Sequence, residues 1–293
     1  MKRNIYLKTI PPAEAVARVK ASIDREALIR EETIPSHEAS GRVLAHAVHA
    51  RYSSPTFHSA AMDGYAVNAR STFAAREGHP LTLKAGETCF AVNTGHPMPE
   101  GCDAVIMIEQ VVLDGGSVTI EAPAFPWQHV RRIGEDIVAT ELLFPRNHQL
   151  RPWDVGALLS GGIWDVPVWE RVTVRIIPTG DEVLDFTTHP DPGKGQVVES
   201  NSQMLAALAR ELGCVVERAA PVPDNPEALH QALKDSLDAG RHLTIFCAGS
   251  SAGSKDFTRA TLEKEGEILT HGIAAMPGKP SLLANCRGRL VAG

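Results

Sequence analysis

The sequence predicts an α/β protein, and three observations point to that class. From Arg171 onward, short apolar runs typical of strands alternate with helical patterns that end at Gly213 and Gly240. Between residues 81 and 120, short β-like segments are separated by turn signals, which indicates a small all-β module. Residues 11–30 carry apolar side chains at helical spacing. Because alternating strands and helices build open, mostly parallel sheets, we expect such a domain in the C-terminal half, with an inserted β module and a mixed connecting domain before it.

The order of these patterns along the chain sets the expected domain limits. We assign residues 1–27 to an N-terminal helix that packs on the α/β domain, residues 28–50 and 140–170 to a connecting domain, residues 51–139 to the inserted β-rich domain, and residues 171–293 to the α/β domain. Within the inserted domain, Asp114-Gly115-Gly116 is a strong hairpin signal. Residues 140–169 have a helix-like pattern, and their tryptophans, Trp153, Trp164 and Trp169, are expected to be packing anchors.

The C-terminal half indicates which residues share one edge of the sheet. Strands are expected over residues 172–177 and 243–247, and a helix from Asn201 whose one face carries four large apolar residues, Met204, Leu205, Leu208 and Leu212. Ligands of open α/β sheets bind at the carboxyl ends of the strands. This rule places three segments along one edge: Thr179 to Glu182, Asp224, and Gly249 to Asp256.

The loop after the strand at 243–247 has the composition of an anion site. It consists of small residues, Ala248-Gly249-Ser250-Ser251-Ala252-Gly253-Ser254, followed by a predicted polar helix that Lys255 and Asp256 open. Such a loop lets backbone N–H groups face a phosphate, and the helix that follows adds its positive dipole end. A plain turn that needs small residues for packing explains the loop equally well.

Two other charged stretches have simple structural explanations. Asp63-Gly64 is by default a turn, and Arg131 to Ile137, with two cations and two acids around Gly134, is by default a solvated surface loop.

Composition excludes several classes of protein. A net charge of −6 argues against general nucleic-acid binding and against binding to anionic membranes, since both depend on dispersed Lys and Arg. No apolar run reaches the length of a membrane span, and no secretory signal is visible. Five cysteines are scattered without C-x-x-C spacing, which favours a reducing cytoplasm over a disulfide scaffold.

Taken together, the motifs resemble the molybdopterin molybdenumtransferase family, of the MoeA and gephyrin E-domain type. They occur in the order of that family and cover nearly the whole chain: S-A-A-M-D-G-Y-A-V (59–67), N-T-G-H-P-M-P-E-G-C-D-A-V (93–105), R-R-I-G-E-D-I (131–137), P-T-G-D-E-V (178–183), E-S-N-S-Q-M-L-A-A-L (199–208), D-N-P-E-A-L (224–229), G-S-S-A-G-S-K-D-F-T (249–258) and M-P-G-K-P (276–280). The resemblance implies a molybdopterin-binding-like α/β domain.

The resemblance also implies an activity and a set of site residues. Members of the family insert molybdate into adenylylated molybdopterin and release AMP, assisted by a divalent cation such as Mg²⁺. They are homodimers in which the α/β domain of one subunit faces the M-D-G-Y segment of the other, and the adenylyltransferase that makes their substrate is a possible partner. The implied catalytic residues are Asp136, Glu182, Asp224, Asp256 and Lys279. The implied pterin-binding residues are Asp63, Thr94, Thr179, Gly180, Asp181, Asn201, Gly249, Ser251, Gly253, Pro277 and Gly278, and the implied Mg²⁺ ligands are Asp181, Glu182 and Asp256.

Three departures from the family pattern favour an alternative to the enzyme, namely a protein that binds the substrate without converting it. His58 stands where the family has an Asp, and Met276 stands where it commonly has a second Lys. The sequence stops at Gly293, where family members continue into a turn, a helix and a β domain, so the α/β domain is expected to be incomplete and the C-terminal β domain missing. These features suit a catalytically impaired molybdopterin or molybdate carrier. A third interpretation, the related adenylylating enzyme, is disfavoured, because that enzyme shares the α/β domain but has no counterpart of residues 54–140 of this chain.

Overall fold

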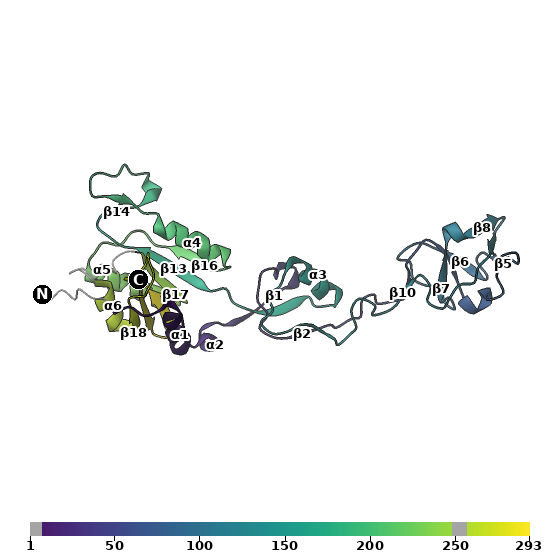
Figure 1. The fold of residues 1–293 in the computed structure, drawn as a ribbon, viewed down its shortest axis with the longest axis horizontal. Coiled ribbons are helices and arrows are strands. Elements are labelled where there is room, and N and C mark those ends of the chain that lie inside the picture. The colour runs from purple at the N-terminus through teal and green to yellow at the C-terminus, as the bar shows by residue number, and fades with distance from the viewer. Residues whose placement is uncertain (1–7, 248–256) are drawn as a thin grey trace. The chain divides into compact units, whose positions relative to one another are not determined.

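The computed structural model describes residues 8–247 and 257–293, and the chain divides into two compact units (Figure 1). Unit 1 comprises Met1–Glu32 and Trp169–Gly293, and unit 2 comprises Thr33–Val168. No helix within the described ranges is both long enough and apolar enough to cross a membrane.

A six-stranded sheet in the order β16-β13-β17-β20-β19-β18 forms the centre of unit 1. Its strands are β13 (Thr173–Pro178), β16 (Val215–Arg218), β17 (Leu243–Cys247), β18 (Gly266–His271), β19 (Leu282–Cys286) and β20 (Arg289–Ala292). The four strands from β16 to β20 pair in parallel, whereas β19 pairs antiparallel with both β18 and β20. The expected strands at 172–177 and 243–247 are confirmed, and the sheet is mixed.

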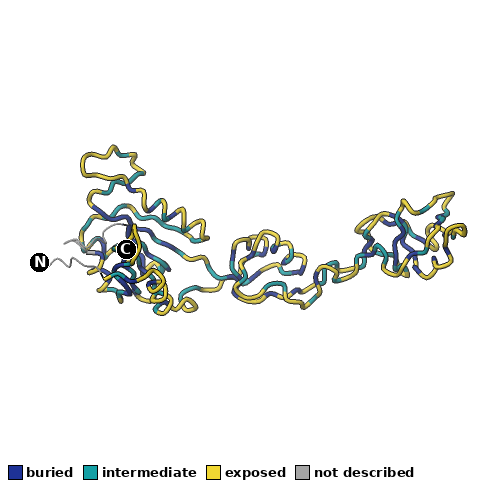
Figure 2. Tube along the Cα trace, in the orientation of Figure 1, coloured by how far each residue is buried: buried dark blue, intermediate teal, exposed yellow. Residues whose placement is uncertain are grey.

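Helices and a small two-stranded sheet accompany this sheet in unit 1. They are α1 (Pro12–Ser22), α2 (Arg25–Leu28), α4 (Asn201–Glu211), α5 (Pro226–Asp238), α6 (Phe257–Glu265), the 3-10 helix η4 (Phe186–Thr188), and the parallel pair β14 (Val183–Leu184) and β15 (Val197–Val198). Leu229, Leu233 and Leu237 of α5 pack with Ile177 and Phe246 in the main core of the unit. The guanidinium of Arg18 on α1 donates to the Leu269 carbonyl of β18 at 2.9 Å. Buried residues follow the strands of the sheet (Figure 2).

Helix α4 begins at Asn201 as expected, but most of its apolar face does not pack on the sheet. Met204, Leu208 and Leu212 are 64%, 52% and 74% exposed, while Ala206 is fully buried and Leu205 packs against the same core. The helix therefore contacts the sheet mainly through small residues. A row of large apolar side chains, spaced four residues apart, faces away from it.

Unit 2 is built from short strands, 3-10 helices and the α-helix α3. Its three-stranded sheets are β6-β4-β7 and β5-β9-β8, and its two-stranded pairs are β10-β3 and β11-β2. The elements are η1 (Ser36–Glu38), β2 (Val48–His49), β3 (Ser59–Ala60), β4 (Gly64–Val67), η2 (Ala69–Thr72), β5 (Leu81–Lys84), β6 (Cys89–Val92), β7 (Ala104–Met107), η3 (Ile108–Gln110), β8 (Val111–Asp114), β9 (Ser117–Ile120), β10 (Val130–Arg131), β11 (Leu142–Phe144) and α3 (Pro152–Ser160). Strands β1 (Glu31–Pro35) and β12 (Asp165–Trp169) pair where the two units join in sequence.

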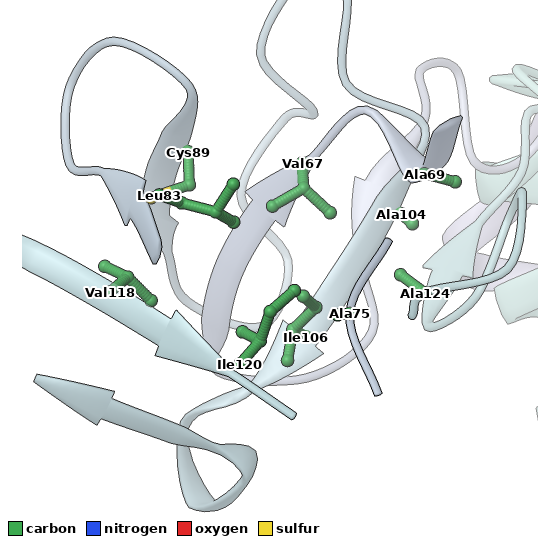
Figure 3. Close-up of a cluster of buried hydrophobic side chains, with 10 residues drawn as sticks. All are labelled: Val67, Ala69, Ala75, Leu83, Cys89, Ala104, Ile106, Val118, Ile120 and Ala124. Carbon is green, nitrogen blue, oxygen red and sulfur yellow. The ribbon is translucent and has the colours of Figure 1, made fainter. Parts of the chain in front are cut away.

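The β-rich part of unit 2 has a core of small and branched side chains. Ten buried residues, among them Val67, Ile106 and Ile120, form this cluster (Figure 3). The expected hairpin around Asp114 is confirmed: β8 and β9 pair antiparallel, and Gly115 and Gly116 have the positive φ angles of 51° and 90° that the turn requires.

Residues 140–169 are less helical than expected, because β11 and β12 flank the nine-residue helix α3. Trp153 and Trp164 are 67% and 55% exposed, so the prediction that they anchor the packing is wrong for both. Leu158 instead provides the fully buried contact of α3.

Candidate functional site

The carboxyl edge of the sheet in unit 1 brings together two segments of the expected site. The Thr179 amide, directly after β13, donates to the Cys247 carbonyl at the end of β17 at 2.9 Å, and the Gly180 amide donates to the Val222 carbonyl at 3.1 Å. Asp181 accepts a hydrogen bond at Oδ1 from the Asp224 amide at 3.1 Å. Residues 179–181 and the segment up to Asp224 therefore lie side by side, although 43 positions separate Asp181 from Asp224.

Gly180 is a glycine for a steric reason. Its φ is 137°, and a Cβ at this position would lie 2.8 Å from Cγ2 of Val183 and 3.0 Å from both carboxylate oxygens of Glu182. Real Cβ atoms do not approach other atoms that closely, so only glycine fits without movement. The Glu182 carboxylate consequently lies over the Gly180 backbone, and it makes no hydrogen bond or ion pair within the described part of the chain.

A buried polar network that sequence reasoning missed holds the start of α4. Glu199 is 6% exposed and accepts from the Ser202 amide at 2.6 Å and from the Ser202 hydroxyl at 2.5 Å. Arg218 donates to the Ser202 hydroxyl at 2.9 Å and to Asp185 at 3.1 Å. The amide of Thr187, together with Arg218, holds the pKa of Asp185 below its usual value. The sequence held one signal for this network: Glu199 stands three residues before Ser202, a spacing that resembles a helix-capping pattern.

This network and the pair β14-β15 place Asn201 next to the carboxyl edge. The Val197 amide donates to the Glu182 carbonyl at 3.0 Å, and the Glu199 amide donates to the Leu184 carbonyl at 2.9 Å. Asn201, the first residue of α4, follows two residues later. The buried thiol of Cys247 is not a nucleophile here, because burial and the nearby Glu199 charge raise its pKa to about 11.

Pro277, Gly278 and Lys279 lie in the exposed turn between β18 and β19. Strand β18 runs in the same direction as β20, since both are antiparallel to β19, so this turn leaves the sheet at the carboxyl edge. The hydrogen bonds of the turn lie within unit 1. The Lys279 carbonyl accepts from the Ile273 amide at 3.0 Å, and the Gly278 carbonyl accepts from the Ser281 amide at 3.0 Å and from its hydroxyl at 2.7 Å. No described contact joins Lys279 to Asp181 or Glu182.

Four expected site residues lie outside the described ranges. They are Gly249, Ser251, Gly253 and Asp256.

A second group of expected site residues lies within unit 2. Asp63 accepts hydrogen bonds at Oδ1 from the Thr94 amide at 2.6 Å and from the Thr94 hydroxyl at 3.0 Å. The hydrogen bond from the backbone amide is the main reason why the pKa of Asp63 is lowered. Gly64 begins strand β4 rather than closing a turn, and a Cβ on it would lie 2.0 Å from the Ile106 carbonyl oxygen of the neighbouring strand. The M-D-G-Y motif thus combines a closely packed glycine, Gly64, with an acid, Asp63, that is held by a threonine 31 positions away in the sequence.

Asp136 and His58 also have defined contacts in unit 2. Arg131, at the end of β10, donates to both carboxylate oxygens of Asp136 at 2.5 Å, and this ion pair is about half exposed. His58 accepts at Nδ1 from the Ile133 amide at 3.1 Å, and its ring lies 4.8 Å from that of Trp127. His58 therefore holds the loop 131–137 through its hydrogen bond to Ile133, and its ring contacts Trp127, which precedes that loop.

The chemistry of the donor set at the carboxyl edge fits a hard divalent cation. Asp181 retains one carboxylate oxygen that the Asp224 amide does not use, and both oxygens of Glu182 lack a hydrogen-bond partner among the described residues. Carboxylate oxygens are the ligands that Mg²⁺ prefers. The described residues alone do not bring three His, Cys, Asp or Glu side chains together, and the third expected ligand, Asp256, lies outside them.

Replacing Thr94 by Val should raise the pKa of Asp63 towards its ordinary value. The change removes the hydroxyl donor but keeps the backbone donor, so we expect only part of the lowering to be lost. Carbon NMR of the Asp63 carboxyl group during an acid titration measures this shift. Thr82→Val, at an exposed position of β5, is the matched control, and an unchanged Asp63 pKa in Thr94→Val would contradict the role given to the hydroxyl.

Comparison with known proteins gives matches over almost the whole chain. The model of the MoeA N-terminal region (domain I and II) matches residues 10–162, and the model described as "Probable molybdopterin binding domain" matches residues 175–291. A molybdopterin molybdenumtransferase from Synechococcus elongatus is 31% identical over 86% of this chain and 67% of its own length. A protein of the same name from Haemophilus influenzae is 33% identical over 85% of this chain and 64% of its own. This chain thus spans about two thirds of the length of these relatives.

Among solved structures, a molybdopterin biosynthesis MoeA protein from Pyrococcus horikoshii is similar to this fold. Its TM-score is 0.81 at 28% identity, over 98% of this chain and 74% of that one.

Proposed function

This chain belongs to the molybdopterin molybdenumtransferase (MoeA) family, and from that premise we propose that it inserts molybdate into adenylylated molybdopterin with release of AMP. The observation that carries the proposal is the unpartnered Glu182 carboxylate over Gly180, beside Asp181 and Asp224, at the carboxyl edge of an α/β sheet. An acid without a partner in the described part of the chain is available for a cationic ligand. This edge is also where open α/β sheets bind their ligands.

Mg²⁺ forms part of the proposal, with Asp181, Glu182 and Asp256 as its ligands. When bound, Mg²⁺ would offset the negative charge of the phosphate and molybdate oxygens and so ease cleavage of the P–O bond. The carboxylates would otherwise repel an anionic substrate, which is why a cation belongs between them.

The residues of the chain have separate roles in this proposal. Lys279 neutralises the phosphate as a point charge, and the Asp224 amide orients Asp181 through the 3.1 Å hydrogen bond. The remaining proposed residues bind the pterin substrate or, for Asp136, act in catalysis: Asp63, Thr94, Asp136, Thr179, Gly180, Asn201, Gly249, Ser251, Gly253, Pro277 and Gly278. None of these acids is proposed as a nucleophile, since their task is to position the metal and water.

A homodimer is also part of the proposal, because the resemblance to the family implies one. The exposed side chains of Met204, Leu208 and Leu212 on α4 support this, since apolar rows of this kind mark contact surfaces. Light scattering should give a molar mass of about twice 31.5 kDa. A mass of one chain at micromolar concentration would refute the dimer.

The proposed compartment is the cytoplasm, and the proposed supplier of substrate is the upstream adenylyltransferase. All five cysteines are free thiols, and Cys89, Cys247 and Cys286 are buried, which suits a reducing compartment. Fractionation of cells that produce the protein would test this assignment, and recovery outside the cytoplasm would refute it.

A non-catalytic carrier of molybdopterin or molybdate is the second candidate. Two observations favour it: Met276 is 88% exposed at the position where a second Lys is common, and the His58 Nδ1 is occupied by the Ile133 amide. Incubation of the protein with adenylylated molybdopterin, Mg²⁺ and molybdate separates the two functions. The enzyme releases AMP only when molybdate is present, whereas a carrier binds the pterin and releases none.

A further inference from the structure

An open cavity of about 740 Å³ lies in unit 1, away from the candidate site. Thr173 and Arg289, the first residues of β13 and β20, line it, and so does His242, which precedes β17. These three strands are parallel, so the cavity is at their amino ends, whereas the candidate site is at their carboxyl ends. The rest of the wall comes from the segment between Ser22 and Arg30, from Glu170, from residues 238–241 at the end of α5, and from the turn between β19 and β20 at Arg287 and Gly288.

Every carboxylate in the wall of this cavity already has a partner. Asp24 caps α2 by accepting from the Glu26 and Ala27 amides, both at 3.1 Å. Glu170 accepts from the Arg30 amide at 2.7 Å and lies 3.4 Å from Nε2 of His242. The third acid, Asp238, accepts from Arg287 at 2.9 Å.

Only two of the four arginines in the wall form an ion pair with a carboxylate within the described residues. Arg287 pairs with Asp238 and Glu265, and Arg241 pairs with Glu217 at 2.7 Å. By contrast, the guanidinium groups of Arg289 and Arg30 make no hydrogen bond or ion pair within the described residues.

Arg289 is the more constrained of the two unpaired arginines. Its Nε is shielded from solvent and has no acceptor. Its Nη2 lies 3.7 Å from the point that a Cβ on Gly240 would occupy, so the guanidinium extends alongside the end of α5. A shielded N–H without an acceptor costs free energy, but a solute in the cavity does not reach Nε. An anion there would bind the Nη groups of Arg289, which have no acceptor within the described residues either.

We propose that this cavity is a binding site for a small oxyanion, a phosphate or carboxylate group, which the guanidinium of Arg289 binds with help from Arg30. Each acid of the wall is held at one oxygen by a partner, whereas two arginine side chains have no partner within the described residues. Four arginines and three acids line the cavity, so its wall carries an excess of one positive charge with His242 neutral. The planar fork of arginine matches the two oxygens of a phosphate or carboxylate. The volume is within the usual range for small-molecule sites.

The test titrates the full chain with inorganic phosphate and, separately, with succinate, and follows the amide NMR signals of Gly240 and Gly288. Both glycines line the cavity, so their shifts report binding at this place and not at the carboxyl edge. We expect saturable shifts with at least one probe. Arg289→Gln should weaken that binding at least about tenfold, because a charge-assisted hydrogen bond is lost.

The controls separate loss of binding from loss of folding. Arg210→Gln removes the same charge from an exposed position of α4 and should leave the affinity unchanged. Arg30 is exposed, so Arg30→Gln should fold normally and weaken binding by a smaller factor, which keeps the test decisive if Arg289→Gln does not fold. Binding of phosphate alone assigns the site to phosphates, and binding of succinate alone assigns it to carboxylates. The proposal is overturned if neither probe shifts Gly240 and Gly288 at millimolar concentration, or if both Arg289→Gln and Arg30→Gln bind like the unmodified protein.

Discussion

Glu182→Gln should lower molybdate-dependent AMP release by roughly ten- to a hundredfold, the usual effect of losing a group that positions a metal. The amide keeps the size of the side chain but loses the negative charge with which a carboxylate strengthens binding of a hard cation. Because the Glu182 carboxylate has no described hydrogen-bond partner, its replacement should leave folding unchanged. The initial rate at saturating Mg²⁺ measures the effect.

Glu211→Gln is the matched control for this experiment. Glu211 is an exposed acid at the end of α4, so its replacement should leave both the rate and thermal unfolding unchanged. A Glu182→Gln variant that retains the full rate would remove Glu182 from the proposed machinery.

Asp154→Ala should destabilise unit 2 by about 2–4 kcal/mol, since it removes a helix cap and charge-assisted hydrogen bonds at once. Asp154 is 3% exposed. It accepts from the Arg151 amide at 2.9 Å, from the Arg151 guanidinium at 3.0 Å and from His148 Nε2 at 2.7 Å. Urea unfolding at neutral pH measures the loss. Asp165→Ala, at an exposed position, should change stability little.

The contribution of Asp154 should also depend on pH. The guanidinium of Arg151, its amide and His148 hold the pKa of Asp154 well below its ordinary value of 3.8. A lowered pKa in the folded state means that this stability is complete above about pH 4 and is lost as the pH falls further towards the folded pKa. Asp154→Asn should therefore unfold with less pH dependence in that acid range. Equal acid sensitivity of the two proteins would contradict the assignment.

Sequence patterns predicted the elements that depend on local spacing. Leu229, Leu233 and Leu237 recur at helical spacing and are buried together in α5, and the hairpin at Asp114 follows from its two glycines. Helix α4 shows the limit of this reasoning. Its row of Met204, Leu208 and Leu212 has the right period, yet periodicity cannot tell whether an apolar face packs on its own sheet.

The site was predictable only where one rule applied, namely that open α/β sheets bind ligands at the carboxyl ends of their strands. That rule put Thr179 to Glu182 and Asp224 at one edge, and the structure brings Asp181 and Asp224 into contact. The contact between Asp63 and Thr94 spans 31 positions, and no local pattern in the sequence encodes it. The hydrogen bonds of Arg218 to Ser202 and Asp185 depend on how β16 pairs with β13, so they too required the structure.

The central claim is that this chain places molybdenum in the dithiolene of molybdopterin. The most direct measurement is a single turnover with adenylylated molybdopterin, Mg²⁺ and molybdate, followed by mass spectrometry of the pterin and quantification of AMP. The account predicts one molybdenum-bearing pterin for each AMP released, with neither product formed when molybdate is left out. Release of AMP without molybdenum in the pterin, or bound pterin with no AMP at all, would contradict it.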